Sequence, residues 1–226
     1  MIFAILFFSI SIFHQDVGAT PELRVTSSST DSSNSSSLII YFEAGCPPCD
    51  HFFSEVLRPA YYEVQNILKL EFVPFGNAKS EYWAEYDRYG FSCQHGIEEC
   101  ASGIFMACAV TTSTNYDQLV DLILCTMGYS DFTGGAYYAW NFCSTFSGAD
   151  YDAIMECLAG KDGETAFIQM QNKTLANSDY EGTPWVNFNG DSSSGVQSSI
   201  TKDKATFIKT VCHSVDQSYW PTVCTQ

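Results

Sequence analysis

Hydrophobic residues in this chain occur both as short continuous runs and as longer stretches with helical spacing. Residues 38–42 are apolar and rich in β-branched and aromatic side chains, which predicts a buried strand. In residues 46–68 apolar positions recur every three or four residues, which predicts an amphipathic helix with a kink at Pro59. Residues 70–75 predict a second strand. A strand, a helix and a strand with short connections indicate a right-handed crossover and parallel pairing.

The middle of the chain has a different pattern. Residues from about 80 to 175 show helical spacing, few strand signals and six of the ten cysteines, so we predict a helical insertion there. Strand character returns at residues 184–188, where Asn189-Gly190 follows as a turn signal. Residues 203–211 predict a last helix. The sequence thus predicts an α/β domain with a helical, disulfide-rich insertion.

The N-terminus has features of a secretory signal. Residues 2–13 form an apolar run, and small residues suit cleavage near Ala19, although no Lys or Arg precedes the run. The run is shorter than the ~20 residues that a membrane span needs. We therefore expect a signal peptide at 1–19, a flexible Ser-rich arm at 20–37 and a folded domain at 38–226.

The charge of the chain excludes several partners. Ten Lys and Arg residues stand against 26 Asp and Glu residues, which gives a net charge of −16. Such a surface repels phosphate backbones and anionic headgroups, so we expect no binding to nucleic acid or to acidic membrane surfaces. No later segment resembles a membrane span, so we also expect no stable membrane insertion. In an oxidising secretory compartment most of the ten cysteines are expected to pair.

The most informative residues are Cys46-Pro47-Pro48-Cys49, where the first predicted strand passes into the helix. Two cysteines at this spacing on a helix start form a small, easily reduced disulfide. Free backbone N–H groups and the helix dipole lower the pKa of the Cys46 thiol, which makes Cys46 the nucleophile. Cys49, one turn further in, becomes the resolving thiol. Because prolines lack N–H groups, the Cys49 amide remains as the donor to the Cys46 sulfur.

A structural zinc site and an ordinary structural disulfide are the alternatives for this pair. Zinc would need a second Cys or His pair at ligand spacing, and the sequence has no other CxxC motif, so we expect no metal. Thr183-Pro184, before the last predicted strand, favours redox chemistry, because a cis proline beside a CxxC motif leaves a backbone edge open to an extended substrate. The sequence leaves the choice between a cis and a trans bond open.

Several motifs together carry a family resemblance over residues 38–224. They are CPPC after a strand, VPFGNA at 73–78, the signature Cys93-Gln94-His95-Gly96 with Glu99-Cys100 and Cys108, IMEC at 154–157, PWV at 184–186 before Asn189-Gly190, and Cys212 with Cys224. In these motifs the chain resembles the gamma-interferon-inducible lysosomal thiol reductase (GILT) family. One departure is Gly103, where the family usually has Asn.

The resemblance implies a thioredoxin-like fold and reduction of disulfide bonds in proteins delivered to acidic endocytic compartments. It makes Cys46 the attacking cysteine and Cys49 the resolving one, with an external small thiol as reductant and no cofactor. At pH ~5 a thiol with an ordinary pKa of ~8.5 would be only about 0.03% thiolate, so a reductase there needs a lowered pKa. For His95 we expect a structural role, because no acid or second His lies at a suggestive spacing, and for His51 a surface position.

The other eight cysteines are expected to form structural disulfides whose connectivity the sequence leaves open, although Cys212 with Cys224 is a favoured local pair. These eight are Cys93, Cys100, Cys108, Cys125, Cys143, Cys157, Cys212 and Cys224. Asn34 and Asn172 stand in glycosylation sequons. The expected location is the secretory pathway, ending in lysosomes or endosomes or outside the cell.

Three functions compete. The first is a protein-disulfide reductase whose partners are disulfide-containing proteins and a small thiol. The second is an oxidase or isomerase of secretory folding, which uses the same chemistry in the opposite direction. The third is a secreted binding module on a thioredoxin scaffold, in which aromatic residues such as those at 137–140 recognise a partner.

Overall fold

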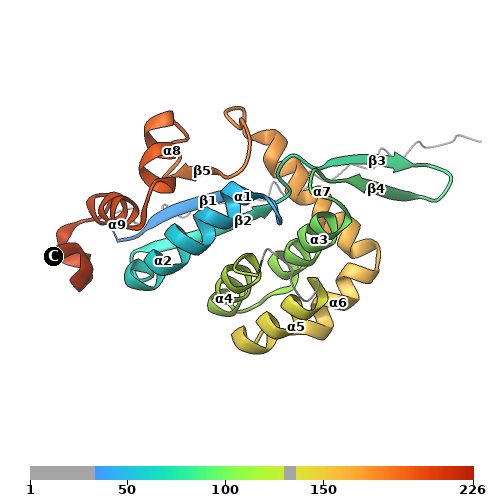
Figure 1. The fold of residues 1–226 in the computed structure, drawn as a ribbon, viewed down its shortest axis with the longest axis horizontal. Helices are drawn as coiled ribbons and strands as arrows, with labels where there is room; N and C mark the ends of the chain where they lie inside the picture. The colour runs from blue at the N-terminus through green and yellow to red at the C-terminus, as the bar shows by residue number, and fades with distance from the viewer. Residues whose placement is uncertain (1–33, 130–135) are drawn as a thin grey trace, which may run out of the picture. The chain divides into compact units, whose positions relative to one another are not determined.

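The computed structural model of the chain describes residues 34–129 and 136–226 (Figure 1). The expected signal peptide at 1–19 and most of the expected arm at 20–37 lie outside the described residues. The described part is a mixed α/β structure with a three-stranded sheet, a two-stranded sheet, many helices and four disulfides. The α/β class predicted from the sequence is thus confirmed.

The larger sheet has strand β1 (Ser36–Phe42) at its centre, between β2 (Leu68–Pro74) and β5 (Trp185–Phe188). β1 pairs in parallel with β2 and antiparallel with β5. The central position of β1 follows from its sequence, because Leu38, Ile40 and Phe42 are completely buried. The predicted first strand and its parallel partner are both confirmed.

The boundary between the Ser-rich arm and the domain differs from the prediction. β1 begins at Ser36, so Ser36 and Ser37 belong to the sheet and not to an arm that runs to residue 37. They pair with Leu68 and Lys69 of β2 through the backbone. Backbone pairing holds these two serines in the strand, and their side chains give no hydrophobic signal that would reveal it.

The predicted first helix is present in three pieces. They are α1 (Pro47–His51), a π-helical segment η1 (Phe52–Leu57) and α2 (Arg58–Val64). The Arg58 amide donates to the Phe53 carbonyl five residues earlier, which widens the turn just before Pro59. A proline ring clashes with the carbonyl four residues before it, and a π-turn relieves that clash. The predicted interruption is confirmed, and the helix ends earlier than predicted because Leu68 already belongs to β2.

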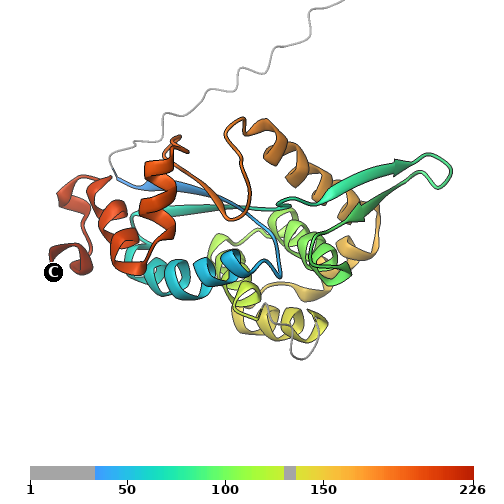
Figure 2. The same ribbon diagram turned by 45° about the horizontal axis from the view of Figure 1, so that its top comes forward.

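Residues 80–175 are not helical throughout, which corrects the predicted insertion. Its first part is an antiparallel hairpin of β3 (Lys79–Trp83) and β4 (Arg88–Ser92). Both faces of the hairpin are largely exposed, so it lacks the alternation of buried and polar positions that marks a strand in sequence. Figures 1 and 2 show the hairpin at the end of the domain opposite to the C-terminal helices.

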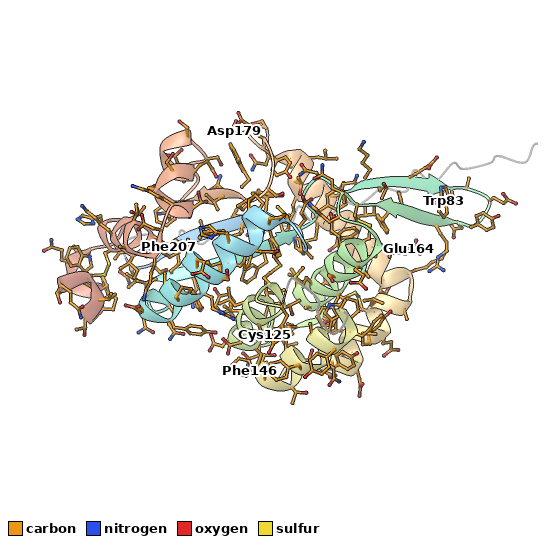
Figure 3. All side chains as sticks on the ribbon, in the orientation of Figure 1. Trp83, Cys125, Phe146, Glu164, Asp179 and Phe207 are labelled. Carbon is orange, nitrogen blue, oxygen red and sulfur yellow. A yellow bond between two sulfur atoms is a disulfide. The ribbon has the colours of Figure 1, made fainter. Side chains whose placement is uncertain are left out.

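Glu164 anchors this hairpin to the helices. Its carboxylate accepts a hydrogen bond from Arg88 Nε at 2.5 Å and another from the Tyr89 amide at 3.0 Å. Arg88 pairs with Trp83 next to the turn of the hairpin, so Glu164, labelled with Trp83 in Figure 3, holds the outer half of the hairpin. Two charge-assisted bonds to one carboxylate therefore fix the orientation of a two-stranded sheet that would be marginal alone.

The rest of the insertion is helical, as predicted. Its helices are α3 (Ile97–Thr112), α4 (Tyr116–Met127), α5 (Ala136–Ser147), α6 (Tyr151–Ala159) and α7 (Lys161–Ala176). One disulfide joins α3 to α6 through Cys108 and Cys157, and another joins α4 to α5 through Cys125 and Cys143. Because α3 and α7 both contact β2, the insertion packs against the sheet.

The C-terminal part returns to the sheet and ends in helices. After β5, Asn189 and Gly190 form the predicted turn, with positive φ angles of 52° and 87°. The chain then pairs only at Asp191, so the turn leads to helix α8 (Ser194–Thr201), which the sequence did not predict, and not to another strand. α9 (Lys204–His213) confirms the predicted last helix, and two short 3₁₀ turns, η2 (Gln217–Tyr219) and η3 (Thr222–Thr225), follow. Among the described residues, no helix combines the length and apolar character that crossing a bilayer requires.

Candidate active site

Cys46 and Cys49 lie where β1 passes into α1. Cys46 is the N-cap residue of α1, with the two prolines at the first helical positions, and its carbonyl accepts a hydrogen bond from the Asp50 amide at 2.9 Å. Neither cysteine is in a disulfide. Cys46 is 5% exposed and Cys49 is completely buried, so Cys46 is the member of the pair nearer to solvent.

The two thiols have opposite pKa shifts. The pKa of Cys46 is lowered from 9.0 to about 6, first because the Cys49 thiol donates a hydrogen bond to it, with smaller contributions from Thr183 and the Cys49 amide. Burial and the charge of Glu43 oppose this shift. Burial and the bond to Cys46 raise the pKa of Cys49 above its ordinary value. The Cys49 amide thus acts as predicted, but the Cys49 thiol contributes more.

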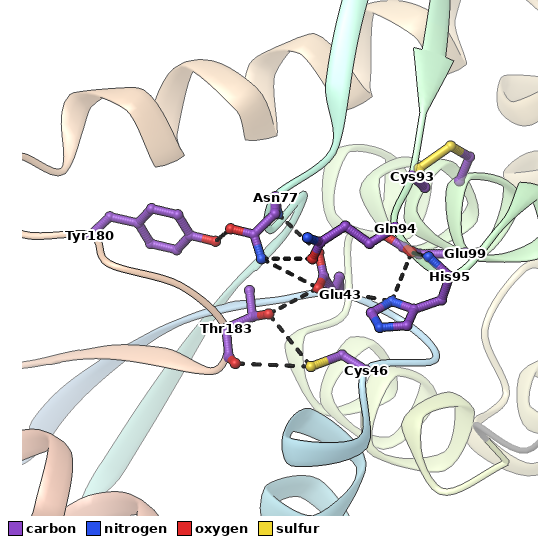
Figure 4. A network of polar contacts seen from close by, with 10 residues as sticks. Glu43, Cys46, Asn77, Cys93, Gln94, His95, Glu99, Tyr180 and Thr183 are labelled. Atoms are coloured by element: carbon purple, nitrogen blue, oxygen red, sulfur yellow. Dashed lines mark hydrogen bonds and ion pairs between the residues drawn. A yellow bond between two sulfur atoms is a disulfide. The ribbon is translucent and has the colours of Figure 1, made fainter.

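Thr183 and Pro184 lie beside Cys46, although 137 residues separate Cys46 from Thr183 in the chain. The Cys46 sulfur lies 3.9 Å from the Thr183 carbonyl oxygen and 3.5 Å from its hydroxyl oxygen (Figure 4). The Thr183–Pro184 peptide bond, which the sequence left open, is cis. The structure therefore brings the two predicted groups of residues together, and the role of Thr183 and Pro184 in substrate binding stays a prediction.

Glu43, three residues before Cys46, is the main site residue that sequence reasoning missed. It is 3% exposed, and its carboxylate accepts hydrogen bonds from the Thr183 hydroxyl at 3.0 Å and from the Asn77 amide at 2.9 Å (Figure 4). Asn77 is itself held by the Tyr180 hydroxyl at 3.0 Å. The available signal was a charged residue directly after an apolar strand and three residues before a CxxC motif.

His95 has an acidic partner, which corrects the expectation that none lay at a suggestive spacing. Glu99, one helical turn later, accepts from the His95 backbone amide and lies 2.9 Å from His95 Nδ1. Glu99 is 3% exposed, and burial and the nearby Glu43 raise its pKa. His95 also lies between Cys93 and Cys100, which form a disulfide, in agreement with a structural role. His51 is exposed, as expected.

Glu43, His95 and Glu99 bring ligand-type atoms within 4.8 Å of one another, the spacing of a metal site. Hydrogen-bond donors already face these atoms: Thr183 and Asn77 donate to Glu43, and His95 donates to Glu99 from its backbone amide. We therefore interpret the cluster as a hydrogen-bonded network beside the thiols.

The eight other cysteines form four disulfides. The pairs are Cys93–Cys100, Cys108–Cys157, Cys125–Cys143 and the locally favoured Cys212–Cys224. Of the sequon residues, Asn172 is exposed on α7 and Asn34 precedes β1. Glycosylation of both stays a prediction.

The aromatic residues at 137–140 divide between surface and core. Tyr137 and Tyr138 are exposed, whereas Trp140 is completely buried and stacks on Phe105 with ring centroids 4.7 Å apart. The segment is therefore partly a core element of the insertion and not a continuous aromatic surface.

Together, the two free cysteines with opposite pKa shifts at a strand–helix junction form a candidate thiol-disulfide redox centre on an α/β scaffold that four disulfides cross-link. The sequence model of the family described as "Gamma interferon inducible lysosomal thiol reductase (GILT)" matches residues 37–146. The chain belongs to this GILT family.

Curated relatives extend the similarity over most of the chain. The "Gamma-interferon-inducible lysosomal thiol reductase" of Carassius auratus is 28% identical over 190 residues, which cover 83% of this chain and 71% of that protein. The "Gamma-interferon-responsive lysosomal thiol protein" of Arabidopsis thaliana is 32% identical over 155 residues, 68% of this chain and 61% of that protein. The Mus musculus "Gamma-interferon-inducible lysosomal thiol reductase" is 24% identical over 188 residues, 82% of this chain and 70% of that protein. The names of the fish and mouse relatives describe lysosomal thiol reductases.

Proposed function

We propose that this protein reduces disulfide bonds in other proteins, with Cys46 as the nucleophile and Cys49 as the resolving thiol. The observation that carries the proposal is the opposite shift of the two pKa values: that of Cys46 falls to about 6, and that of the completely buried Cys49 rises. A low pKa supplies thiolate for attack on a disulfide, while a buried thiol is protected from side reactions.

The proposed reaction has two steps. The Cys46 thiolate attacks one sulfur of the substrate disulfide, a bond forms between Cys46 and that sulfur, and the second substrate sulfur leaves as a thiolate that takes up a proton. Cys49 then loses its proton and attacks the Cys46 sulfur, which forms the Cys46–Cys49 disulfide and releases the first substrate sulfur. Two electrons pass from the protein to the substrate, and two equivalents of an external small thiol restore the reduced pair.

The first step prepares Cys49 for the second. In the free enzyme the pKa of Cys49 is raised by burial, by its bond to the Cys46 sulfur and by the charge of the Cys46 thiolate. A mixed disulfide on Cys46 removes that charge and the thiolate acceptor. The Glu43 backbone amide, which lowers the pKa of Cys49, remains in place. Cys49 therefore becomes easier to deprotonate when its attack is needed.

The scaffold supports a thioredoxin-like fold as part of this proposal. The redox pair follows the end of β1, β2 pairs with β1 in parallel after a helical crossover, and β5 follows Pro184 in the antiparallel direction. The helices and hairpin between β2 and β5 form the insertion in this scaffold.

We further propose that the protein works in an acidic compartment of the secretory or endocytic route. Thiolate stabilisation favours the reduced form of the pair and so makes it a better oxidant. Below the Cys46 pKa of about 6 this stabilisation fades, so acid shifts the pair toward reduction of other disulfides. The equilibrium with glutathione at neutral and acidic pH separates this direction from an oxidase or isomerase.

The test is reduction of insulin at acidic pH by a small thiol, with and without the protein. We expect turnover with the wild-type protein and none with Cys46→Ser. The matched control is the double variant Cys212→Ala and Cys224→Ala, which removes a disulfide remote in sequence from the pair and should keep turnover. Equal turnover by wild type and Cys46→Ser would contradict the proposal.

A further inference from the structure

The Thr183 hydroxyl lies between two groups that compete for its single hydrogen. Its oxygen is 3.0 Å from Glu43 Oε1 and 3.5 Å from Cys46 Sγ (Figure 4). An ionised carboxylate only accepts, so it must receive the Thr183 hydrogen. The Cys46 sulfur then faces lone pairs of the Thr183 hydroxyl and, at 3.9 Å, of the Thr183 carbonyl. These lone pairs suit a thiol that donates its hydrogen, and they oppose a thiolate. Thr183 lowers the pKa of Cys46 only when its hydrogen points at the sulfur.

The remaining contacts of Glu43 determine which of its oxygens can carry a proton. Oε2 accepts from the Asn77 backbone amide at 2.9 Å, and a backbone amide cannot become an acceptor. Oε1 faces Thr183, and its other polar neighbours lie further away, Asn77 Nδ2 at 3.4 Å and His95 Nδ1 at 4.0 Å. Asn77 Nδ2 itself lies nearer to Gln94, at 3.1 Å. A proton on Glu43 therefore belongs on Oε1, where it points at the Thr183 oxygen and releases the Thr183 hydrogen.

We propose that Glu43 is a positioning residue that acts on Cys46 through Thr183. Ionised Glu43 holds the Thr183 hydrogen away from the sulfur, and protonated Glu43 turns that hydrogen onto the Cys46 thiolate. The same three groups form a proton path: the Cys46 proton passes to the Thr183 oxygen while the Thr183 hydrogen passes to Glu43. One negative charge moves from oxygen to sulfur, and no electron is gained or lost. This inference rests on the proposed nucleophilic role of Cys46.

Other titratable groups from each neighbouring element belong to the same network. They are Cys49 on α1, His95 before α3, Glu99 on α3 and Tyr180 before β5. Cys49 donates to the Cys46 sulfur, and Glu99 contacts His95, which lies 4.0 Å from Glu43 Oε1. Glu99 bonds to His95 and not to Thr183. Its substitution therefore changes the local charge without removing a hydrogen-bond partner of the Thr183 hydroxyl.

Glu43→Gln tests the proposal because its amide reproduces the hydrogen-bond pattern of the protonated acid. The amide oxygen can accept from the Asn77 amide, and the amide nitrogen can donate to Thr183. The readout is the pH titration of the Cys46 thiolate in the reduced protein, followed by ultraviolet absorbance without any substrate. We expect the midpoint to fall by about one unit relative to wild type, since a hydrogen bond to a charged group has that strength.

The decisive comparison is to measure the effect of Glu43→Gln in a protein that also carries Thr183→Val, because valine keeps the shape of the side chain and removes the hydroxyl. With Val at position 183, the downward shift caused by Glu43→Gln should shrink to a few tenths of a unit. An equal shift in both backgrounds would show that Glu43 acts only through its charge, and would overturn the proposal. Glu99→Gln, the matched control, should shift the midpoint by less than half as much as Glu43→Gln.

A second comparison covers the case in which Glu43→Gln does not fold, which circular dichroism would reveal. Thr183→Val alone should lower the Cys46 midpoint, because it removes the hydroxyl lone pairs that face the sulfur while Glu43 is ionised. Thr183→Ser, which keeps a hydroxyl, should restore it. If the Cys46 midpoint of Thr183→Val equals that of wild type, Glu43 does not act on Cys46 through Thr183, which would contradict the proposal. Insulin reduction by the wild-type protein separates this inference from the proposed function. If the Cys46 midpoints shift as expected but insulin is not reduced, only the proposed function is contradicted. If insulin is reduced but the midpoints do not shift, only the action of Glu43 through Thr183 is contradicted.

Discussion

The Glu43 carboxylate packs directly against the backbone of Gly76. A β-carbon at position 76 would lie 2.4 Å from Glu43 Oε2, closer than any real contact allows. Gly76 also has a positive φ of 58°, which side chains rarely adopt. The turn after β2 and the acid at the end of β1 therefore fit together only because residue 76 has no side chain.

Gly76→Ala should lower the free energy of unfolding by more than the ~1–2 kcal/mol that a left-handed backbone costs an ordinary residue, because Glu43 must also move. Gly190→Ala is the matched control: its φ is 87°, and nothing lies within 4 Å of an added β-carbon, so it should show the backbone cost alone. Urea unfolding of the two variants measures both losses. Equal losses would mean that Glu43 accommodates the added methyl group.

The rate of alkylation of Cys46 by iodoacetamide should follow its lowered pKa. Because the pKa is lowered from 9.0 to about 6, the thiolate dominates above pH 6 and is lost as the pH falls through that value. At pH 5 the rate should be about one tenth of its plateau at neutral pH. Mass spectrometry should find the label on Cys46 and not on the buried Cys49. A rate that still rises steeply between pH 7 and pH 9 would contradict the lowered pKa.

The four structural disulfides should contribute unequally to stability. Cys108–Cys157 closes a loop with a sequence separation of 49 residues, and Cys93–Cys100 one of only 7 residues. In the chain-entropy description, replacing the first pair by alanine should cost about 4 kcal/mol and replacing the second about 2 kcal/mol. Denaturant unfolding of the two double variants tests the order, and a larger loss for the short loop would contradict it.

Gly103 should not tolerate the Asn that the family usually has there. A β-carbon at position 103 would lie 2.8 Å from the Phe167 ring, which packs against Phe75 and Phe91. Gly103→Asn should therefore destabilise the protein by about 1–3 kcal/mol, as overpacked cores do. Phe167→Leu in the same chain should recover part of the loss, measured by thermal unfolding. If the smaller residue recovers nothing, the ring is not the obstacle.

The sequence predicted the elements whose burial leaves a pattern. β1 and β2 are recognisable as apolar runs, and the helix from Cys46 carries one apolar stripe that Pro59 interrupts, so the crossover and the position of the redox pair followed. The β3–β4 hairpin was missed because both of its faces are exposed, and it is fixed instead by Glu164, more than 70 residues further along the chain.

At the site, local spacing identified Cys46 and Cys49, because their chemistry depends on neighbours along one helix turn. The contacts of Glu43 could not be predicted in the same way, because Asn77 and Thr183 reach it from 34 and 140 residues away. His95 shows a different limit: its partner Glu99 was visible at a helical spacing, but only the fold shows that the two side chains meet.

The roles of the two thiols can be tested most directly by trapping the intermediate. Cys49→Ser, mixed with a disulfide-bonded substrate at acidic pH, should accumulate a covalent complex, because no resolving thiol remains to release it. Mass spectrometry of the digested complex should place the substrate sulfur on Cys46. Turnover by Cys49→Ser at the wild-type rate, or a complex attached to any other cysteine, would contradict the account.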